Sequence, residues 1–289
     1  METPDEIQSP ELSSTVMTII NRGIRHIKDL ETEIANWARD NTRIIHHESP
    51  DGKHYEIEIK VLTPPPSEEW GQIFGDAIHR FRSALDAWMW EKANELSDRP
   101  IKAHEVQYPI ANNQETWDRW RKKTGKYLDE FLVAALGELQ PYLHTVEGQN
   151  ALASLHKIDI IDKHQGSIKI ELLPDSIGDT TFSSPVGGET ENRAIVSQFE
   201  VDSTNGGVIQ IDFDHAPLDL RLPTNFQWVA AFRTDAGIHN TSEALRIFAY
   251  APERYPKLAE IKAARLRAAA KLEAAERDDD ATDDDDREK

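Results

Sequence analysis

The sequence predicts an α+β fold: a helical bundle with an inserted β-hairpin, followed by an antiparallel β-rich C-terminal half and a C-terminal helix. Three observations predict it. Apolar residues recur at helical spacing through most of 10–166, they alternate with polar residues in short segments from 167 onward, and turn residues separate those segments. We expect a single compact domain over 10–256, mainly helical over 10–166 and β-rich with one helix over 167–256.

The first two elements are a helix and a hairpin. A helix is expected over 13–41, because Val, Ile, Leu and Trp recur there at helical spacing. The hairpin is expected over 42–62. Its second strand, 54–61, alternates apolar and charged residues as a half-buried strand does, and Pro-Asp-Gly at 50–52 supplies the turn.

Four further helices are expected before residue 167. Ser67 is a favourable N-cap with two glutamates directly after it, which predicts a helix over 67–96. Shorter helices are expected over about 114–128 and 129–139, and another over 146–164. The predicted buried stripe of the 67–96 helix consists of Phe74, Ile78, Phe81, Leu85, Trp88 and Met89.

The β-rich half follows from alternation and turn residues. Strands are expected over 194–201 and 208–213, because they flank Asn-Gly-Gly, a strong hairpin signal. A helix is expected over 240–250, since Asn240 and Glu243 have the spacing of a capping box. Additional strands are expected over 168–172, 218–222 and 227–232.

The end of the chain changes in composition. Pro252 and Pro256 are expected to interrupt the preceding helix. The segment 257–276 is rich in Ala and in charged residues, which indicates a solvated helix. A disordered acidic tail is expected over 277–289 and a disordered lead-in over 1–9.

Composition excludes several classes of site. The 289 residues are enough to bury a core, they carry a net charge of -19, and they contain no Cys, which excludes disulfides and thiolate chemistry. No apolar run approaches the roughly 20 residues that span a bilayer, and no secretory signal is visible, so we expect a cytoplasmic protein without a membrane partner. Broad nucleic-acid binding is not expected, because phosphate contacts need clustered Lys and Arg.

The first candidate site segment is Gly75–Asp86. His79, Arg82 and Asp86 stand at i, i+3 and i+7, which places them on one stripe of a helix. An imidazole, a guanidinium and a carboxylate so placed can bind a phosphate or position a water. A simpler alternative stays open, in which Arg82 and Asp86 form an intrahelical ion pair and His79 is a boundary residue.

The second candidate segment is Leu155–His164. Its candidates are Asp159, Asp162 and Lys163 for binding and His164 for catalysis. A metal site is not expected, because His156 and His164 lie more than two helical turns apart and no established metal motif is present. The alternative is a charged helix end, where Lys163 and His164 complement the helix dipole.

Together these segments resemble an uncharacterised family of bacterial and actinophage proteins. The family pattern has G-D-x-I-H-x-x-R-S-A-L-D, then Y/F-P-I, Q-P-Y and D-K-H. In this sequence the motifs are Gly75–Asp86, Tyr108–Ile110, Gln140–Tyr142 and Asp162–His164. The resemblance covers roughly 70–166 and implies a bacterial or phage origin, but it implies no particular activity.

A more distant resemblance is to the HEPN superfamily of helical-bundle ribonucleases and toxins. These proteins use an Arg followed, after four to six residues of the same helix, by a His. Arg82 corresponds to the Arg, but residues 87–89 are Ala, Trp and Met, so the motif is broken. The resemblance then implies that His79 or His164 supplies the imidazole from another position, or that the chain is a non-catalytic relative.

Three functional hypotheses follow, and the sequence leaves open whether the protein is an enzyme. The first is a binding or regulatory protein of HEPN-like type, in phage biology or host defence, that binds a nucleotide or a partner protein in a polar pocket between 75–96 and 146–164. The second is a metal-independent ribonuclease or phosphoesterase using Arg82 with His79 or His164. The third is a structural or interaction protein with an acidic tail. No cofactor is expected, and a homodimer stays open.

Overall fold

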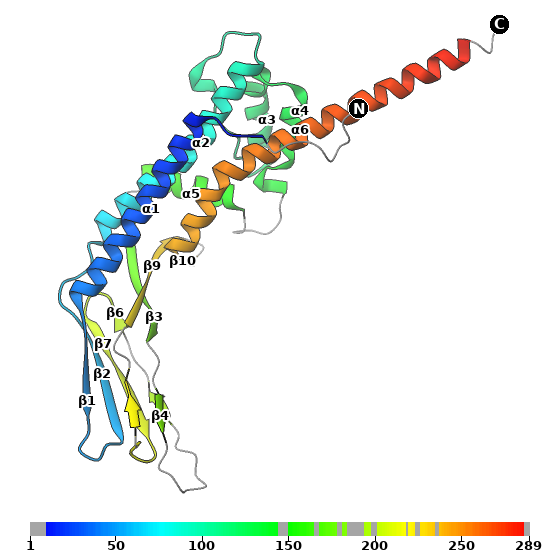
Figure 1. Ribbon diagram of the computed structural model, residues 1–289. Coiled ribbons are helices and arrows are strands. Elements are labelled where there is room, and N and C mark those ends of the chain that lie inside the picture. The colour runs from blue at the N-terminus through cyan, green and yellow to red at the C-terminus, as the bar shows by residue number, and fades with distance from the viewer. Residues whose placement is uncertain are drawn as a thin grey trace. The chain divides into compact units, whose positions relative to one another are not determined.

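The computed structural model describes residues 10–143, 150–164, 168–177, 181–183, 194–197, 201–217, 219–222, 226–234 and 237–285. It confirms the α+β fold class, with antiparallel sheets and a C-terminal helix (Figure 1). The chain divides into two compact units, which differs from the single domain that we expected over 10–256. The helical unit comprises Met1–His26, Gly75–Gly166 and Leu245–Lys289, and the β unit comprises Ile27–Phe74 and Ser167–Ala244.

The division has a physical reason in strand pairing. The hairpin 42–62 pairs with a strand more than 140 residues later, with Tyr55 opposite Ile211 and Ile57 opposite Ile209. The hairpin therefore belongs to the same sheet as the C-terminal strands. Long-range pairing of this kind leaves no mark in local sequence patterns, because alternation shows that a strand forms but not which strand it meets.

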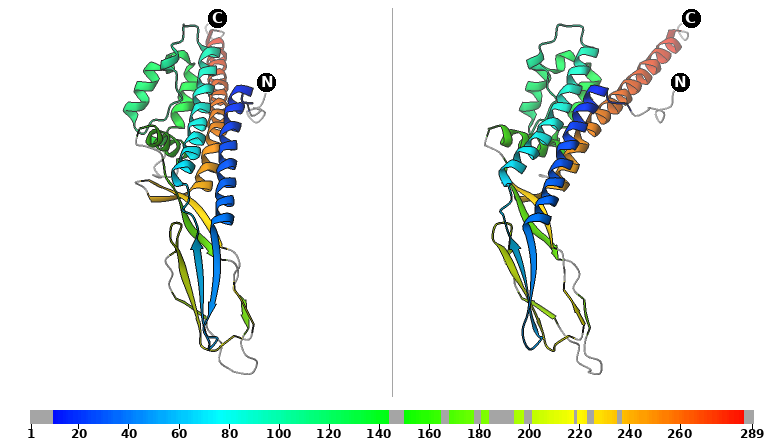
Figure 2. Two further views of the ribbon diagram at one scale, coloured as in Figure 1. Left: turned by 90° about the vertical axis from the view of Figure 1, so that its left-hand side faces the viewer. Right: turned by 60° about the vertical axis from the view of Figure 1, so that its left-hand side comes forward.

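The helical unit contains three long helices and several short ones. In both views of Figure 2, α2 lies within this unit beside α1 and beside the orange part of α6, and the red end of α6 extends beyond them. The helices are α1 (Ser14–Asn41), α2 (Ser67–Leu96), α3 (Gln114–Lys123), α4 (Glu130–Glu138), α5 (Ala151–His164) and α6 (Thr241–Asp285), and short 3-10 helices are η2 (Ala103–Glu105), η3 (Gly125–Tyr127) and η4 (Pro141–Leu143).

The core of this unit forms around α2. The predicted apolar stripe is buried along its whole length, and Phe81 lies so near Gly23 of α1 that a Cβ there would stand 2.6 Å from the ring. On another side, the indole of Trp88 donates a hydrogen bond of 3.0 Å to Glu260 of α6. The side chains of α2 that do not face α1 or α6 are therefore the ones available to build a site.

The β unit is built from antiparallel sheets. The largest has the order β1-β2-β7-β5, with β6 also paired to β7, and a second has the order β10-β9-β3. One apolar face buries Tyr55, Ile57 and Ile59 of β2 against Ile209 and Ile211 of β7. The strands are β1 (Thr42–Glu48), β2 (His54–Val61), β3 (Ile170–Ile177), β4 (Thr181–Ser183), β5 (Ala194–Ser197), β6 (Val201–Asp202), β7 (Gly206–Phe213), β8 (Asp219–Arg221), β9 (Phe226–Thr234) and β10 (Gly237–Asn240).

The C-terminal helix departs most from expectation. Helix α6 continues through Pro252 and Pro256, so the predicted interruption was wrong, and it extends to Asp285 through most of the segment 277–289 predicted to be disordered. Both prolines are buried and lie one helical turn apart, where packing offsets the lost N–H groups. An established helix then adds one hydrogen bond for each further residue. The predicted lead-in over 1–9 lies outside the described residues.

Candidate functional site

The two candidate segments come together where α2 and α5 pack against each other. A Cβ added at Gly75 of α2 would meet the carboxylate of Asp162 on α5 closer than real Cβ atoms approach another heavy atom. One helical turn further along α2, His79 contacts Asp159 of α5. The absence of a side chain at Gly75 therefore allows a close approach, which brings the polar residues of both helices within hydrogen-bond distance.

A chain of polar contacts crosses this helix pair. The Nδ1 atom of His79 lies 3.3 Å from Oδ1 of Asp159, and the Nζ atom of Lys163 lies 2.7 Å from the other carboxylate oxygen. The Nε2 atom of His79 lies 3.5 Å from the hydroxyl of Ser83. The side chain of Asp159 is 6% exposed, whereas His79 is 48% exposed, so a buried carboxylate orients a solvent-facing imidazole.

Arg82 is used differently from its predicted role. Its side chain is 9% exposed, and the guanidinium forms an ion pair of 2.9 Å with Asp86 on the next helical turn. It also donates a 3.0 Å hydrogen bond to the carbonyl of Tyr108, while the N–H of Tyr108 donates a 2.8 Å hydrogen bond to Asp86. The pair therefore binds both backbone polar groups of Tyr108 and holds its loop in place. The intrahelical ion pair itself was expected as the simpler alternative, whereas the contacts to the loop were not.

The electrostatics of the buried pair reflect this packing. Burial raises the pKa of Asp86 above its ordinary value, although the charge of Arg82 and the N–H of Tyr108 oppose the increase. A buried ion pair of this kind is held by geometry and by the additional hydrogen bonds around it. The guanidinium faces the protein interior and is not presented to a ligand.

His156 is a site residue that the sequence analysis did not select. Its Nδ1 atom is buried without a hydrogen-bond partner within the described part of the chain. Burial lowers the pKa of His156 below its ordinary value, and the nearby charge of Arg82 lowers it further, whereas Asp159 opposes the decrease. The available signal was spacing, because His156, Asp159 and Lys163 stand at i, i+3 and i+7 on one face of α5.

The remaining predicted residues lie at the end of α5. Asp162 packs against Gly75, and burial together with the charges of Asp159 and Asp76 raises its pKa. His164 is the last residue of the helix, but its side chain lies outside the described part of the structure, so its predicted role stays a prediction. Among the residues that the structure describes, no group of three or more His, Asp or Glu side chains is placed to hold a metal ion.

The polar cluster therefore has two sides with different properties. On the buried side, Arg82 and Asp86 pair with each other and with backbone. On the exposed side, His79 and Lys163 share the buried carboxylate of Asp159. These five residues line neither a cavity between α3 and α4 nor one between α4 and α6, two hollows within the described part of the helical unit.

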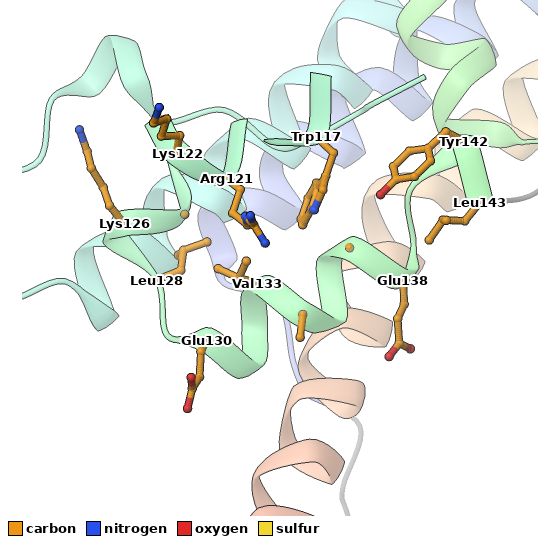
Figure 3. A pocket seen from close by; sticks show the side chains of 13 residues that line it. Trp117, Arg121, Lys122, Lys126, Leu128, Glu130, Val133, Glu138, Tyr142 and Leu143 are labelled. Atoms are coloured by element: carbon orange, nitrogen blue, oxygen red, sulfur yellow. The ribbon is translucent and has the colours of Figure 1, made fainter. Parts of the chain in front are cut away.

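The larger of those cavities, of about 740 Å³, lies between α3 and α4 (Figure 3). It combines apolar side chains with a basic edge that contains Arg121, Lys122 and Lys126. The sequence analysis did not select these residues; the signal was the run Arg119–Lys126, which has five basic and no acidic residues in a chain of net charge -19. The lining residues are Trp117, Arg121, Lys122, Gly125, Lys126, Leu128, Glu130, Val133, Ala134, Gly137, Glu138, Tyr142 and Leu143.

Comparisons of the chain with protein-family models, with curated proteins and with solved structures give no match. The family resemblance of the α2 and α5 motifs is therefore neither supported nor refuted by them. No helix within the described ranges is both long and apolar enough to cross a membrane. Functional inference accordingly depends on the geometry of the two sites.

Proposed function

We propose that the protein is a binding and regulatory protein of the HEPN-like helical type, and that the exposed side of the α2–α5 cluster contacts a partner protein. The observation that supports this proposal is the fixed orientation of His79. Its Nδ1 atom faces the buried carboxylate of Asp159, and about half of its side chain faces solvent. An imidazole held in one orientation at a surface is suited to the recognition of a partner.

The charge around His79 favours a cationic group of a partner over a phosphate. Arg82 is buried and paired, so it does not reach a ligand at this surface. Lys163 already pairs with Asp159, whereas Asp76 is exposed and Asp162 is partly exposed. The surface is therefore acidic on balance, and electrostatic complementarity selects a basic segment of a partner protein.

The experiment that tests this proposal uses two probes on the full-length protein. A short Lys- and Arg-rich peptide and adenosine monophosphate are titrated separately, and the imidazole resonances of His79 are followed by NMR. We expect the peptide to shift these resonances and the nucleotide to leave them unchanged. Nucleotide-induced shifts without peptide-induced shifts would overturn the proposal.

Matched variants separate a specific site from bulk acidity. Asp76→Asn combined with Asp162→Asn removes two negative charges at the site, and Glu31→Gln combined with Glu33→Gln removes two exposed charges of α1. We expect peptide affinity to fall roughly tenfold in the first variant only, since one surface charge contributes up to about 1 kcal/mol. Equal losses of affinity in both variants would show that binding depends only on the overall negative charge of the protein.

A second candidate function is a metal-independent ribonuclease or phosphoesterase, and one arrangement favours it. The contacts from Asp159 through His79 to Ser83 are those that orient an imidazole as a general base. In this version Lys163 supplies the positive charge near the substrate, and Arg82 maintains the fold. RNA turnover with a chelator present tests it: activity must appear in the wild type, vanish in His79→Gln and fall in Lys163→Ala. Absence of wild-type turnover removes the enzymatic hypothesis.

A further inference from the structure

The cavity between α3 and α4 has walls that are already in place. Trp117 stacks on Trp120 with ring centroids 5.0 Å apart and planes at 21°, and a Cβ at Gly137 would stand 3.0 Å from the Trp117 ring. One helix is thus fixed against the other by an indole that has little freedom to move. A volume of about 740 Å³ falls within the range of small-molecule sites.

The interior of the cavity is mainly aliphatic. Leu128 and Val133 are partly exposed in it, and Leu143 at its edge has 51% of its surface exposed. Trp117 is 6% exposed, and Trp120 stacks on one face of its ring. The lining therefore suits an alkyl chain, and it offers no open indole face on which a nucleobase could stack.

The basic residues of this region differ in whether they already have partners. Arg119 pairs with Glu115 at 2.8 Å and Lys126 pairs with Glu105 at 2.6 Å. Arg121, in contrast, reaches an acid only at 3.7 Å, and 61% of its side chain is exposed. Of the two arginines of this helix, Arg121 therefore has the weaker internal pairing.

The directions of the charged side chains agree with this assignment. Figure 3 shows Arg121 extending between α3 and α4 toward Trp117 and Val133. In the same view Glu130 and Glu138 extend away from the space between the two helices. Lys122 is exposed on α3, and its side chain also extends away from that space, which leaves Arg121 as the charge directed into it. The charge that faces the cavity is therefore positive, although the protein as a whole carries -19.

We propose that this cavity binds an amphipathic anion, with its carboxylate or phosphate head at Arg121 and its alkyl chain along Leu128, Val133 and Leu143. The guanidinium forms charge-assisted hydrogen bonds with either head group. Transfer of the alkyl chain from water to the aliphatic lining supplies the remaining affinity. The ligand in this proposal is a free molecule rather than a membrane lipid. None of the residues of the α2–α5 cluster lines this cavity.

The test is calorimetric titration of the full-length protein with monomeric dodecanoate and dodecyl phosphate, each below its micelle concentration. Acetate tests the head group alone, octyl glucoside tests a neutral amphiphile, and phosphatidylglycerol vesicles test a membrane source. We expect one dodecanoate or dodecyl phosphate per protein and no binding of acetate or octyl glucoside. Binding of octyl glucoside with equal affinity, or binding to vesicles alone, would overturn the proposal.

Three variants place the ligand in the cavity. Arg121→Ala is expected to weaken dodecanoate binding at least tenfold, whereas Arg119→Ala, which removes the same charge from the same helix outside the lining, leaves it within twofold. Ala134→Trp fills the space from an exposed position and is expected to abolish binding. Retained binding in Ala134→Trp, or equal losses in the two arginine variants, contradicts the assignment. Circular dichroism of each variant verifies that the fold is kept.

Discussion

The α2–α5 cluster and the α3–α4 cavity each contain an arginine with an acidic neighbour on the same helix, but the two arginines have different fates. Arg82 pairs with Asp86 at 2.9 Å and keeps 9% of its side chain exposed. Arg121 reaches Asp118 only at 3.7 Å and keeps 61% of its side chain exposed. The first guanidinium stabilises the fold, and the second is available to a ligand. Burial and backbone contacts, rather than membership of a motif, distinguish the two.

The largest expected effect is a difference in stability between two arginine variants. Arg82→Ala leaves the partly buried Asp86 without its counter-ion and the carbonyl of Tyr108 without its donor. Loss of one partner of a fully buried pair costs about 3–5 kcal/mol. Because Asp86 is 34% exposed, we expect a loss of about 3 kcal/mol in the free energy of unfolding. Arg121→Ala is expected to change the free energy of unfolding by about 0.5 kcal/mol or less. Urea unfolding of both variants measures the difference.

Arg82→Lys refines this first prediction. A lysine retains the charge but cannot bond Asp86 and the Tyr108 carbonyl through a planar fork. We expect the free energy of unfolding of Arg82→Lys to lie between that of the wild type and that of Arg82→Ala. If Arg82→Ala and Arg121→Ala unfold at the same urea concentration, Arg82 does not hold the Tyr108 loop and the comparison fails.

Sequence patterns predicted the fold class and the contact between α2 and α5, but not how that contact is used. Periodicity located the buried stripe of α2, and the two polar segments indicated facing helices. The fate of Arg82 depends on Tyr108, which lies in a loop 26 residues away, and no local pattern records that contact. The continuity of α6 through two prolines has a similar cause, because their burial depends on neighbouring elements.

The second prediction compares two glycines, one in each region. A Cβ at Gly75 would overlap the carboxylate of Asp162, whereas the nearest atoms to a Cβ at Gly125 are the Arg121 Cγ at 3.4 Å and the Val133 Cγ2 at 3.5 Å. Gly75→Ala is expected to destabilise the protein by about 2 kcal/mol, as other overpacked contacts do. Gly125→Ala is expected to be within about 0.5 kcal/mol of the wild type. Thermal unfolding of both variants measures this, and equal effects would show that α2 and α5 can separate without cost.

The third prediction concerns pH and His156, a partly buried imidazole whose pKa responds to the charge of Arg82. The pKa of His156 is lowered in the folded protein, so the folded state favours the neutral ring. The resulting stability is present above the ordinary pKa of about 6.5 and is lost as the pH falls through the lower folded value. We expect His156→Gln to reduce the loss of stability on acidification below about pH 6.5. Unfolding curves at several pH values measure it, and parallel pH profiles for variant and wild type would contradict it.

The smallest expected effect concerns Glu105, which lies beside the cavity region. Its pKa is shifted in a different pH range from that of His156. Hydrogen bonds from Lys126 and from the Tyr127 hydroxyl lower the pKa of Glu105 from 4.5 to about 2. Because this pKa is depressed, the contribution to stability is present above pH 4.5 and is lost only as the pH falls toward about 2. NMR titration of the Glu105 carboxyl carbon measures the shift, and Tyr127→Phe, which removes one donor, is expected to raise the pKa. An unchanged pKa in Tyr127→Phe would show that Lys126 and Lys102 account for the shift without the hydroxyl. The stability linked to His156 begins to fall below about pH 6.5, whereas that linked to Glu105 begins to fall only below pH 4.5. Acidification to pH 5 is therefore expected to weaken the α2–α5 region while the Glu105 contacts beside the cavity persist.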